Sequence, residues 1–384
     1  MKQSGFDVAV VGAGVFGAWM ALHLAKRGQR VLLLEMYGTA HARASSGGES
    51  RIIRTSYGAD EIYTRWSQRS LTQWKELFAA TNEKLFYETG VLWLGAEASD
   101  YLEQSRANLQ LCGVQNEVLE KRELEARYPQ INFDGVARGW FEPHSGVLLA
   151  RRAVNCTVES ALRLGVVLRI AQALAPKGRG RLDSLETTSG ERIAAGQFVF
   201  ACGPWLGKIF PDLLGPRIFP TRQEVFFFGT PPGDLRFAPP SLPTWFFQTD
   251  EVYGMPDIES RGLKLACDIH GPLVDPDTQS RVVSSGKAEW ATQYVAKRFP
   301  SMKGAPIVET RVCQYENTSN GDFLVDGHPD FSNVWLVGGG SGHGFKHGPA
   351  AGEYAAAALI LNGGPLEPRY GLASKAETQN RTVY

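Results

Sequence analysis

Residues 7–35 read DVAVVGAGVFGAWMALHLAKRGQRVLLLE, and their pattern changes twice within one short run. An apolar run over Val8–Val11 predicts a buried strand, and the helical periodicity that follows extends to about Lys26. Gly28 then ends the helix, and a second apolar run over Val31–Leu34 predicts another strand. Strand, helix and strand in this order are typical of a unit that builds a parallel sheet.

Three glycines lie between the first strand and the helix in the spacing GxGxxG: Gly12, Gly14 and Gly17. Gly12 allows a tight turn, Gly14 lets the backbone approach a pyrophosphate, and Gly17 lets helix and strand pack closely. The start of the helix offers unpaired N–H groups and a positive dipole end to phosphates. Glu35 ends the second strand, where a carboxylate can accept hydrogen bonds from a ribose diol. The unit predicts an adenine dinucleotide, and this motif alone leaves NAD and FAD both open.

Composition narrows the class of partner. The chain has 384 residues, and its 40 basic residues balance 40 acidic ones. A neutral chain offers no electrostatic case for nucleic acid or an anionic membrane surface. The apolar N-terminal run is interrupted by glycines, so it is not a signal peptide, and no other run approaches the roughly 20 apolar residues of a membrane helix. We expect a small-molecule partner, no nucleic acid and no membrane.

The cysteines indicate the compartment. There are five, they are scattered through the chain, and they form no CxxC pair. An odd, scattered set argues against a disulfide framework and against a zinc site. A reducing, cytoplasmic location without a bound metal is therefore expected.

The order of the remaining elements indicates how the chain is divided. Elements of the nucleotide-binding type are expected at the start, near 150–205 and at the end, where a glycine loop over 338–348 precedes an alanine-rich helix. Between them, 216–272 is rich in aromatic residues in strand-like runs. Further helical stretches are expected over Glu61–Ala79, about Glu97–Glu125 and Gly286–Phe299. This order favours an α/β (α+β) fold in which a discontinuous Rossmann-like domain carries a second, antiparallel-sheet domain.

Short stretches spread from residue 7 to about 360 carry a resemblance to a known family: DVAVVGAGVFG, GESRIIRTSYG, ETGVLWLG, FEPHSGVL, ACGPW, YGMP, GLKL, VCQY and GGGSGHGFKHG. On these motifs, which occur in the family's order, the chain resembles the D-amino-acid oxidase superfamily of FAD enzymes. The similar branch holds monomeric sarcosine oxidase, N-methyltryptophan oxidase and L-pipecolate oxidase. The resemblance implies an FAD-binding domain over 1–80, 146–215 and 311–384, and a substrate-binding domain over 81–145 and 216–310.

Position by position, the resemblance implies the residues that hold FAD: Gly12, Gly14, Gly17, Glu35, Ser46, Arg51, Gly342 and Lys346. It also implies a flavin bound covalently through Cys313, which matches the family's attachment cysteine. A thiolate can add to the electrophilic 8-methyl carbon of an oxidised flavin, whereas a free cysteine is otherwise often a small buried hydrophobe. N–H groups of the glycine loop and the last helix would stabilise negative charge on the reduced ring.

The resemblance also implies the residues that face the substrate. Arg54 and Lys346 match the pair that grips the substrate carboxylate, and a guanidinium and an ammonium converging on one carboxylate would fix an amino acid. Either could instead be an ordinary surface residue. Lys264 matches the lysine that promotes reaction with dioxygen. Alternatively, its side chain could lie on the polar face of an exposed strand. Tyr253 and Tyr315 match active-site tyrosines.

The chain also departs from the family pattern. Gly47 and Asp268 stand where sarcosine oxidases have histidines, which weakens sarcosine as the substrate without weakening a flavin amine oxidase. The aromatic run Trp245–Phe247 and Tyr253 suggest a partly aromatic pocket, although aromatic residues in a sheet are more often core.

The function expected is an FAD-dependent oxidase of a secondary-amine amino acid, N-methylated or cyclic. A hydride equivalent would pass from the CH–NH group to the flavin, and O2 would be reduced to H2O2. Two alternatives stay open: a flavin dehydrogenase with another electron acceptor, and a noncatalytic dinucleotide-binding protein. We expect a monomer whose partners are a small amino-acid substrate and O2.

Overall fold

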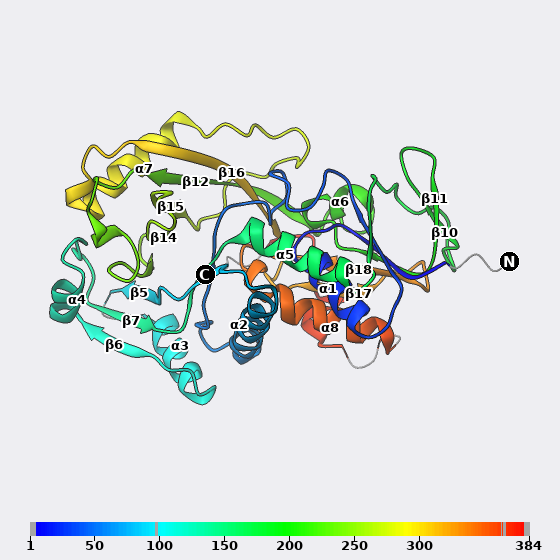
Figure 1. The fold of residues 1–384 in the computed structure, drawn as a ribbon, viewed down its shortest axis with the longest axis horizontal. Coiled ribbons are helices and arrows are strands. Elements are labelled where there is room, and N and C mark those ends of the chain that lie inside the picture. Colours follow the sequence, from blue (N-terminus) through cyan, green and yellow to red (C-terminus); the bar gives the residue numbers. More distant parts are fainter. Residues whose placement is uncertain (1–4, 97–98, 362, 364–365, 380–384) are drawn as a thin grey trace.

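The computed structural model describes residues 5–96, 99–361, 363 and 366–379. Two sheets dominate it and lie at opposite ends of its long axis (Figure 1). The sheet on the right of the figure holds the first strand of the chain, and the sheet on the left carries most of the aromatic strands.

The first sheet runs in the order β17-β18-β11-β1-β2-β9, with β10 paired to β11. The neighbours from β18 to β9 are parallel, and β17 and β10 pair antiparallel at its margins. Its strands are β1 (Phe6–Val11), β2 (Val31–Glu35), β9 (Val167–Ile170), β10 (Ser184–Glu186), β11 (Arg192–Phe200), β17 (Leu324–Gly327) and β18 (Val334–Gly338). The predicted strand–helix–strand unit is confirmed, with α1 over Val15–Lys26.

Alternate side chains of these strands enter two different clusters. Val8 and Leu33 pack with residues of α1, α2 (Glu61–Thr81), α5 (Ala150–Arg163) and α8 (Gly348–Ile360). Ala9 and Leu32 point to the opposite face, where they pack with residues around α6 (Leu206–Ile209). A parallel sheet covered on both faces reads as continuous apolar runs, which is why its strands were predictable.

The second sheet runs in the order β16-β12-β15-β14-β13-β5-β7-β6, and α7 (Ser285–Arg298) packs against it. Its strands are β5 (Val91–Gly95), β6 (Glu117–Glu120), β7 (Arg138–Glu142), β12 (Phe219–Phe228), β13 (Thr244–Phe247), β14 (Val252–Met255), β15 (Leu263–Cys267) and β16 (Ile307–Asn317). The expected antiparallel arrangement holds except for β13 and β5, which pair parallel. These two strands are distant in sequence, so no hairpin constrains their direction.

The stretch expected to be helical from about Glu97 to Glu125 is divided. Glu97 itself lies outside the described residues. The helix α3 (Asp100–Leu111) ends before Gly113, whose φ of 66° is left-handed, and the chain then forms β6 before α4 (Lys121–Arg127). The two ends of this charged stretch are helical, as expected. In the middle, pairing of β6 with β7 outweighs the local preference for a helix.

A small third sheet has the order β3-β8-β4. It consists of β3 (Arg51–Ile53), β4 (Phe86–Tyr87) and β8 (Gly146–Leu148), and β3 leads directly into Arg54. Among the described helices, none is both long enough and apolar enough to cross a membrane. The domain bounds expected from the sequence stay a prediction.

Candidate active site

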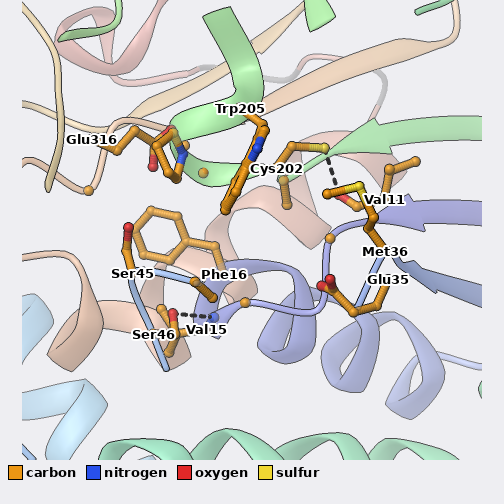
Figure 2. A pocket seen from close by; sticks show the side chains of 18 of the residues that line it. Val11, Val15, Phe16, Glu35, Met36, Ser45, Ser46, Cys202, Trp205 and Glu316 are labelled. Carbon is orange, nitrogen blue, oxygen red and sulfur yellow. Dashed lines mark hydrogen bonds between the residues drawn. The ribbon is translucent and has the colours of Figure 1, made fainter. Parts of the chain in front are cut away.

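A cavity of about 410 Å³, called here the large cavity, lies where the parallel strands of the first sheet end. It is lined by residues at the carboxyl ends of β1, β2, β11 and β18, as is usual for nucleotide sites in such sheets. In Figure 2 the side chains of Phe16, Trp205 and Glu316 lie around one end of the space, with Glu35 and Met36 at another.

The turn at Gly12 could not hold a side chain. Its φ is 103°, and a Cβ placed there would lie 2.4 Å from the carbonyl oxygen of Ala201. A Cβ on Gly17 would lie 1.9 Å from the Gly12 carbonyl oxygen, so α1 packs directly against the turn. Gly12 and Gly14 line the large cavity, and Gly17 supports them from behind. The loop therefore presents bare backbone to whatever occupies the space.

Glu35 lines the large cavity as a charged group. Its Oε2 accepts a hydrogen bond from the Ala13 N–H at 2.8 Å, and its Oε1 lies 3.4 Å from Nε2 of His41. Burial would raise the pKa of Glu35, but the hydrogen bonds from His41 and Ala13 outweigh it and hold that pKa below the ordinary value. The carboxylate is thus an anionic acceptor at the end of β2.

Ser46, Arg51 and Cys313 also line the large cavity. Ser46 Oγ accepts a hydrogen bond from the Val15 N–H at 3.0 Å, which fixes the loop onto the first turn of α1. Arg51 Nη2 donates to the Ser45 carbonyl at 2.8 Å and lies 3.3 Å from Cys313 Sγ. Cys313 is part-buried on β16, so its sulfur faces the cavity beside a guanidinium.

Glu316 is a lining residue that the sequence analysis did not single out. It is 7% exposed, and its Oε1 is buried without a hydrogen-bond partner among the described residues. Burial raises the pKa of Glu316 to about 7, against the opposing effect of the Gly339 and Gly340 N–H groups. A buried acid with an unused oxygen in a cavity indicates that something else completes its hydrogen bonding.

A second cavity of about 70 Å³, called the small cavity, adjoins the large one. Both are lined by Arg51, Tyr315, Gly342 and Phe345, so the two spaces share a wall. The small cavity is further lined by residues from β13, β14 and the 3-10 turn Phe345–His347. Two of the expected substrate residues, Arg54 and Lys346, both line it although they are far apart in sequence.

Arg54 is held in place by its own segment. The residue is 7% exposed, and its guanidinium donates to the Ser56 carbonyl and lies 4.4 Å from the centre of the Tyr57 ring. The segment is anchored by the buried carboxylate of Glu142, which accepts hydrogen bonds from the Thr55 and Ser56 N–H groups at 2.7 and 3.1 Å. A buried guanidinium held in this position can bind an anion in the small cavity through charge-assisted hydrogen bonds.

Lys346 reaches the small cavity from the turn before α8. Its Nζ donates to the Tyr57 hydroxyl at 2.7 Å and to the His343 carbonyl at 3.2 Å. Burial, with the nearby charge of Arg54, holds the pKa of Lys346 well below its ordinary value. Two histidine rings meet the same hydroxyl, His347 Nε2 at 2.7 Å and His343 Nδ1 at 3.1 Å.

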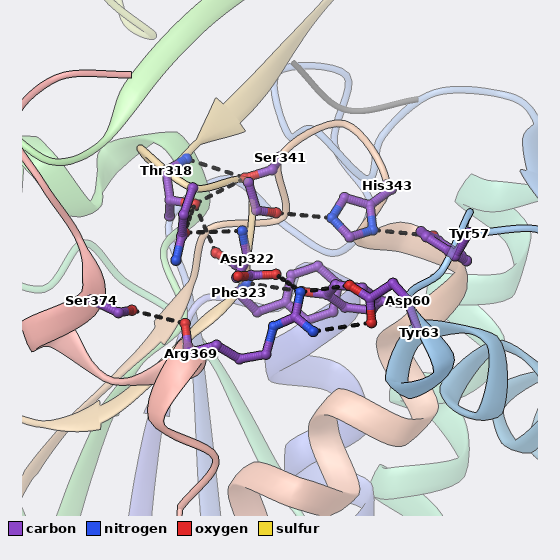
Figure 3. A network of polar contacts seen from close by, with 12 residues as sticks. Tyr57, Asp60, Tyr63, Thr318, Asp322, Phe323, Ser341, His343, Arg369 and Ser374 are labelled. Carbon is purple, nitrogen blue, oxygen red and sulfur yellow. Dashed lines mark hydrogen bonds and ion pairs between the residues drawn. The ribbon is translucent and has the colours of Figure 1, made fainter. Parts of the chain in front are cut away.

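A network of polar contacts lies behind His343 and Lys346, on the side of the small cavity that these residues form (Figure 3). Arg369 donates to Asp322 Oδ1 and Asp60 Oδ2, both at 2.6 Å. Tyr63 donates to the same Asp322 oxygen at 3.0 Å, and the stacked rings of Phe323 and His343 connect it to the cavity. The wall behind Lys346 is therefore tied to the segment near the C-terminal end of the described chain.

The two expected tyrosines also line the small cavity, and Tyr315 donates to Asp268 Oδ1 at 3.3 Å. Burial raises the pKa of Tyr253 to about 12 and that of Tyr315 well above its ordinary value, so both hydroxyls stay protonated. Of the aromatic run, Phe246 lines the cavity. Trp245 and Phe247 belong to the core cluster of the second sheet, because alternate residues of β13 point to opposite faces.

Lys264 lines neither of these cavities. Its Nζ donates to the Ser50 carbonyl at 2.7 Å, and the side chain is 2% exposed. It lines a third cavity of about 70 Å³ together with Met255, which also lines the small cavity. Burial and the charge of Arg51 hold the pKa of Lys264 well below its ordinary value. The lysine is therefore buried and bonded to Ser50, the residue before Arg51 in the chain. It does not lie on an exposed polar face of the sheet.

Tyr57, Glu142 and Glu316 are site residues that sequence reasoning missed. Tyr57 lies three positions after Arg54 in a quoted motif, and Glu316 directly follows Tyr315, so closeness to expected residues was the available signal. Glu142 also stands in a quoted motif, FEPHSGVL, but its hydrogen bonds to Thr55 and Ser56, 87 and 86 positions away, could not be read from that motif.

The chain is similar to several known proteins. The family model described as FAD dependent oxidoreductase (DAO) matches residues 7–358. Human peroxisomal sarcosine oxidase is 30% identical over 96% of this chain and 94% of its own length. Monomeric sarcosine oxidase of Bacillus sp. (strain NS-129) is 30% identical over 91% of each chain. Among solved structures, L-proline dehydrogenase from P. horikoshii superposes with a TM-score of 0.81 at 20% identity, over 96% of this chain and 97% of that one.

Proposed function

Because the chain belongs to the DAO family of FAD-dependent oxidoreductases, we propose that it is an oxidase of an amino acid with a secondary amine. The observation that carries the proposal is the shared wall. A cavity with nucleotide-binding features adjoins a smaller one in which Arg54 and Lys346 converge. The relatives named as sarcosine oxidases support an N-methyl group on the substrate nitrogen, and a cyclic secondary amine has the same CH–NH unit.

The residues of the large cavity fit FAD. The bare backbone at Gly12 and Gly14 suits a pyrophosphate beside the first turn of α1, and the anionic Glu35 suits a ribose diol. The unused oxygen of Glu316 fits a ligand with hydroxyl groups. We propose that Ser46, Arg51, Gly342 and Lys346 complete the site. FAD, when bound, supplies the two-electron oxidant for the C–N bond of the substrate.

The chain's own residues would position the substrate. Arg54 and Lys346, which are both buried, would hold its carboxylate through charge-assisted hydrogen bonds in the small cavity. Phe246 and the neutral Tyr253 hydroxyl would limit the space left for the side chain. Because the two cavities share a wall, a substrate held there would place its CH–NH carbon close to the ligand in the large cavity.

We propose two further roles near that wall. Cys313 would form the covalent link to the flavin, since its sulfur lines the large cavity beside Arg51. Lys264 would favour the reduction of dioxygen, because a buried ammonium behind Arg51 stabilises negative charge that develops there. A monomeric state is also proposed, in line with the relative named as monomeric.

The activity is tested with the purified holoenzyme and a panel of N-methyl and cyclic amino acids. Bleaching of the flavin without oxygen shows oxidation of the substrate, and O2 consumption with H2O2 formation shows the acceptor. Bleaching without O2 consumption would identify a dehydrogenase instead. No bleaching by any member of the panel would overturn the proposal.

The covalent link is tested by acid precipitation. The yellow colour should stay with the wild-type pellet and move to the supernatant in Cys313→Ala. Cys202→Ala is the matched control, because Cys202 lines the same cavity and should leave the colour in the pellet. Colour in the wild-type supernatant would contradict the link.

A further inference from the structure

Asp268 is the one carboxylate among the residues that line the small cavity. It follows β15 directly, and its backbone N–H donates to the Glu251 carbonyl at 2.8 Å, which fixes its position. The cavity's cationic lining comes from Arg51, Arg54 and Lys346. A cavity with one anion among several cations can bind a ligand that carries both charges.

The hydrogen bonding of Asp268 leaves it available to a ligand. Among the described residues, Tyr315 is the only side chain that donates to its carboxylate, at 3.3 Å to Oδ1. Glu142, the other acid near Arg54, is saturated by donors from Thr55, Ser56, Ser145 and Trp93. A carboxylate can accept about four hydrogen bonds, so Glu142 is structural while Asp268 retains unused capacity.

The groups that face Asp268 set its charge. Tyr315 on β16, Arg54 after β3 and Lys346 before α8 favour the anion. Burial acts most strongly and in the other direction, with Glu251 beside β14, and the pKa of Asp268 is raised to about 6. Tyr253 on β14 stays neutral beside them. Asp268 can therefore both carry a negative charge and accept a proton at ordinary pH.

An amino acid brings a second charge that Arg54 and Lys346 cannot accommodate. These two residues suit the carboxylate, but they repel the ammonium group that comes with it. We propose that Asp268 binds the substrate's amino group, first as an ion pair with the ammonium and then as the acceptor of one of its protons. This inference rests on the proposed oxidase function. It assigns to Asp268 the recognition of the amine, and so a preference for zwitterionic substrates over simple acids.

The proton transfer balances without any other reagent. One N–H bond of the ammonium breaks, its electron pair remains on nitrogen, and an O–H bond forms on Asp268. The amine needs that free electron pair to lose a hydride from the neighbouring carbon. The cations of the cavity aid the transfer because they disfavour a further positive charge on the substrate.

The test compares two small acids that differ by one S-methyl group and the positive charge it brings, in titrations of the holoenzyme followed through the flavin absorbance. Dimethylsulfonioacetate carries a positive charge where the amine would be, and (methylthio)acetate carries none. In Asp268→Asn the Kd of the sulfonium acid should rise roughly tenfold or more. The Kd of (methylthio)acetate should stay the same or fall, since a negative charge has been removed, and its binding shows that the cavity is intact.

Two further measurements separate recognition from a merely structural role. In the wild type, sulfonium binding should weaken as the pH falls through about 6, because Asp268 then becomes neutral. This dependence should vanish in Asp268→Asn and persist in Asp268→Glu. Glu251→Gln is the matched control, because Glu251 lies nearby without lining the cavity, and at a pH well above the pKa of Asp268 it should change neither Kd.

The outcomes distinguish the two proposals. If substrates bleach the wild-type flavin but Asp268→Asn binds both acids like the wild type, the assignment of Asp268 is wrong and the oxidase function stands. If (methylthio)acetate and the sulfonium acid weaken equally, Asp268 is structural and the assignment again fails. If no amino acid bleaches the wild-type flavin, the oxidase function fails and the inference fails with it.

Discussion

The buried carboxylate of Glu142 offers a sharp test of how the site is held together. It is 1% exposed and accepts hydrogen bonds from the segment that carries Arg54. The proposed perturbation is Glu142→Gln, which preserves the volume of the side chain and replaces one oxygen by an NH2 group. We expect a loss of stability and weaker binding of carboxylates in the small cavity.

The magnitude follows from counting donors. Oε2 of Glu142 accepts from the Thr55 N–H, and Oε1 accepts from the Ser56 N–H and from Nε1 of Trp93 at 3.0 Å. Hydroxyl donors can rotate and accept instead, but N–H groups cannot, so either orientation of the amide leaves at least one buried N–H without an acceptor. That costs about 1–3 kcal/mol, and the remaining bonds lose their charge assistance, giving about 2–4 kcal/mol in total.

Urea unfolding of the holoenzyme measures the change in the free energy of unfolding, and a flavin titration with (methylthio)acetate measures the change in Kd. The control is Glu88→Gln, because Glu88 is an exposed acid paired with Lys75 and should cost at most about 1 kcal/mol. A loss below about 1 kcal/mol in Glu142→Gln, with an unchanged Kd, would refute the anchoring role.

The pH dependence gives an independent check. Burial would raise the pKa of Glu142, but hydrogen bonds from Ser56, Thr55 and Ser145 outweigh it and hold that pKa below the ordinary value of 4.5. The folded state therefore binds this proton more weakly than the unfolded state does. Its contribution to stability is present above pH 4.5 and is lost as the pH falls through the lower folded value. The acid-side decline in stability should be shallower in Glu142→Gln.

Three further predictions concern the two cavities. Gly12→Ala should yield protein depleted of flavin by absorbance, because the added Cβ meets backbone, while Gly286→Ala, where nothing lies within 4 Å, should retain it. Lys346→Met should raise the Kd of (methylthio)acetate roughly 10–100-fold. In the wild type, binding of this acid should weaken as the pH rises through the depressed pKa of Lys346, and this dependence should disappear in the variant. Lys297→Met, at an exposed lysine, should match the wild type. Burial raises the pKa of Glu316 from 4.5 to about 7, so the folded state loses stability as the pH rises from 4.5 to 7 and this acid ionises. Glu316→Gln should remove that contribution to the decrease in Tm, and an unchanged decrease would contradict the burial of the acid.

How much of this could be predicted from the sequence depended on the range of the interactions. The β1–α1–β2 unit was predictable because its apolar runs, its glycines and Glu35 are local signals for a covered parallel sheet. The strand β6 was not, because its pairing with β7 outweighs a local charge pattern that is helical on both sides. The parallel pairing of β13 with β5 had no local signal at all.

The site shows the same division. Residues in short motifs could be named from the sequence through the family resemblance, and Arg54 and Lys346 do line one cavity. The partners that hold them could not be named. Glu142 reads as an ordinary strand acid, and only the folded chain shows that it anchors the segment before Tyr57. The sequence also could not show that Lys264 lies behind Arg51 in a cavity of its own.

The wall shared by the two cavities has a thermodynamic consequence. Tyr315, Arg51 and Phe345 line both spaces, so a ligand in either cavity contacts side chains that also bound the other. Linkage is reciprocal, so any factor by which one ligand changes the affinity for the other applies equally in the opposite direction. The degree of FAD loading would therefore have to be matched between variants before their affinities for carboxylates are compared.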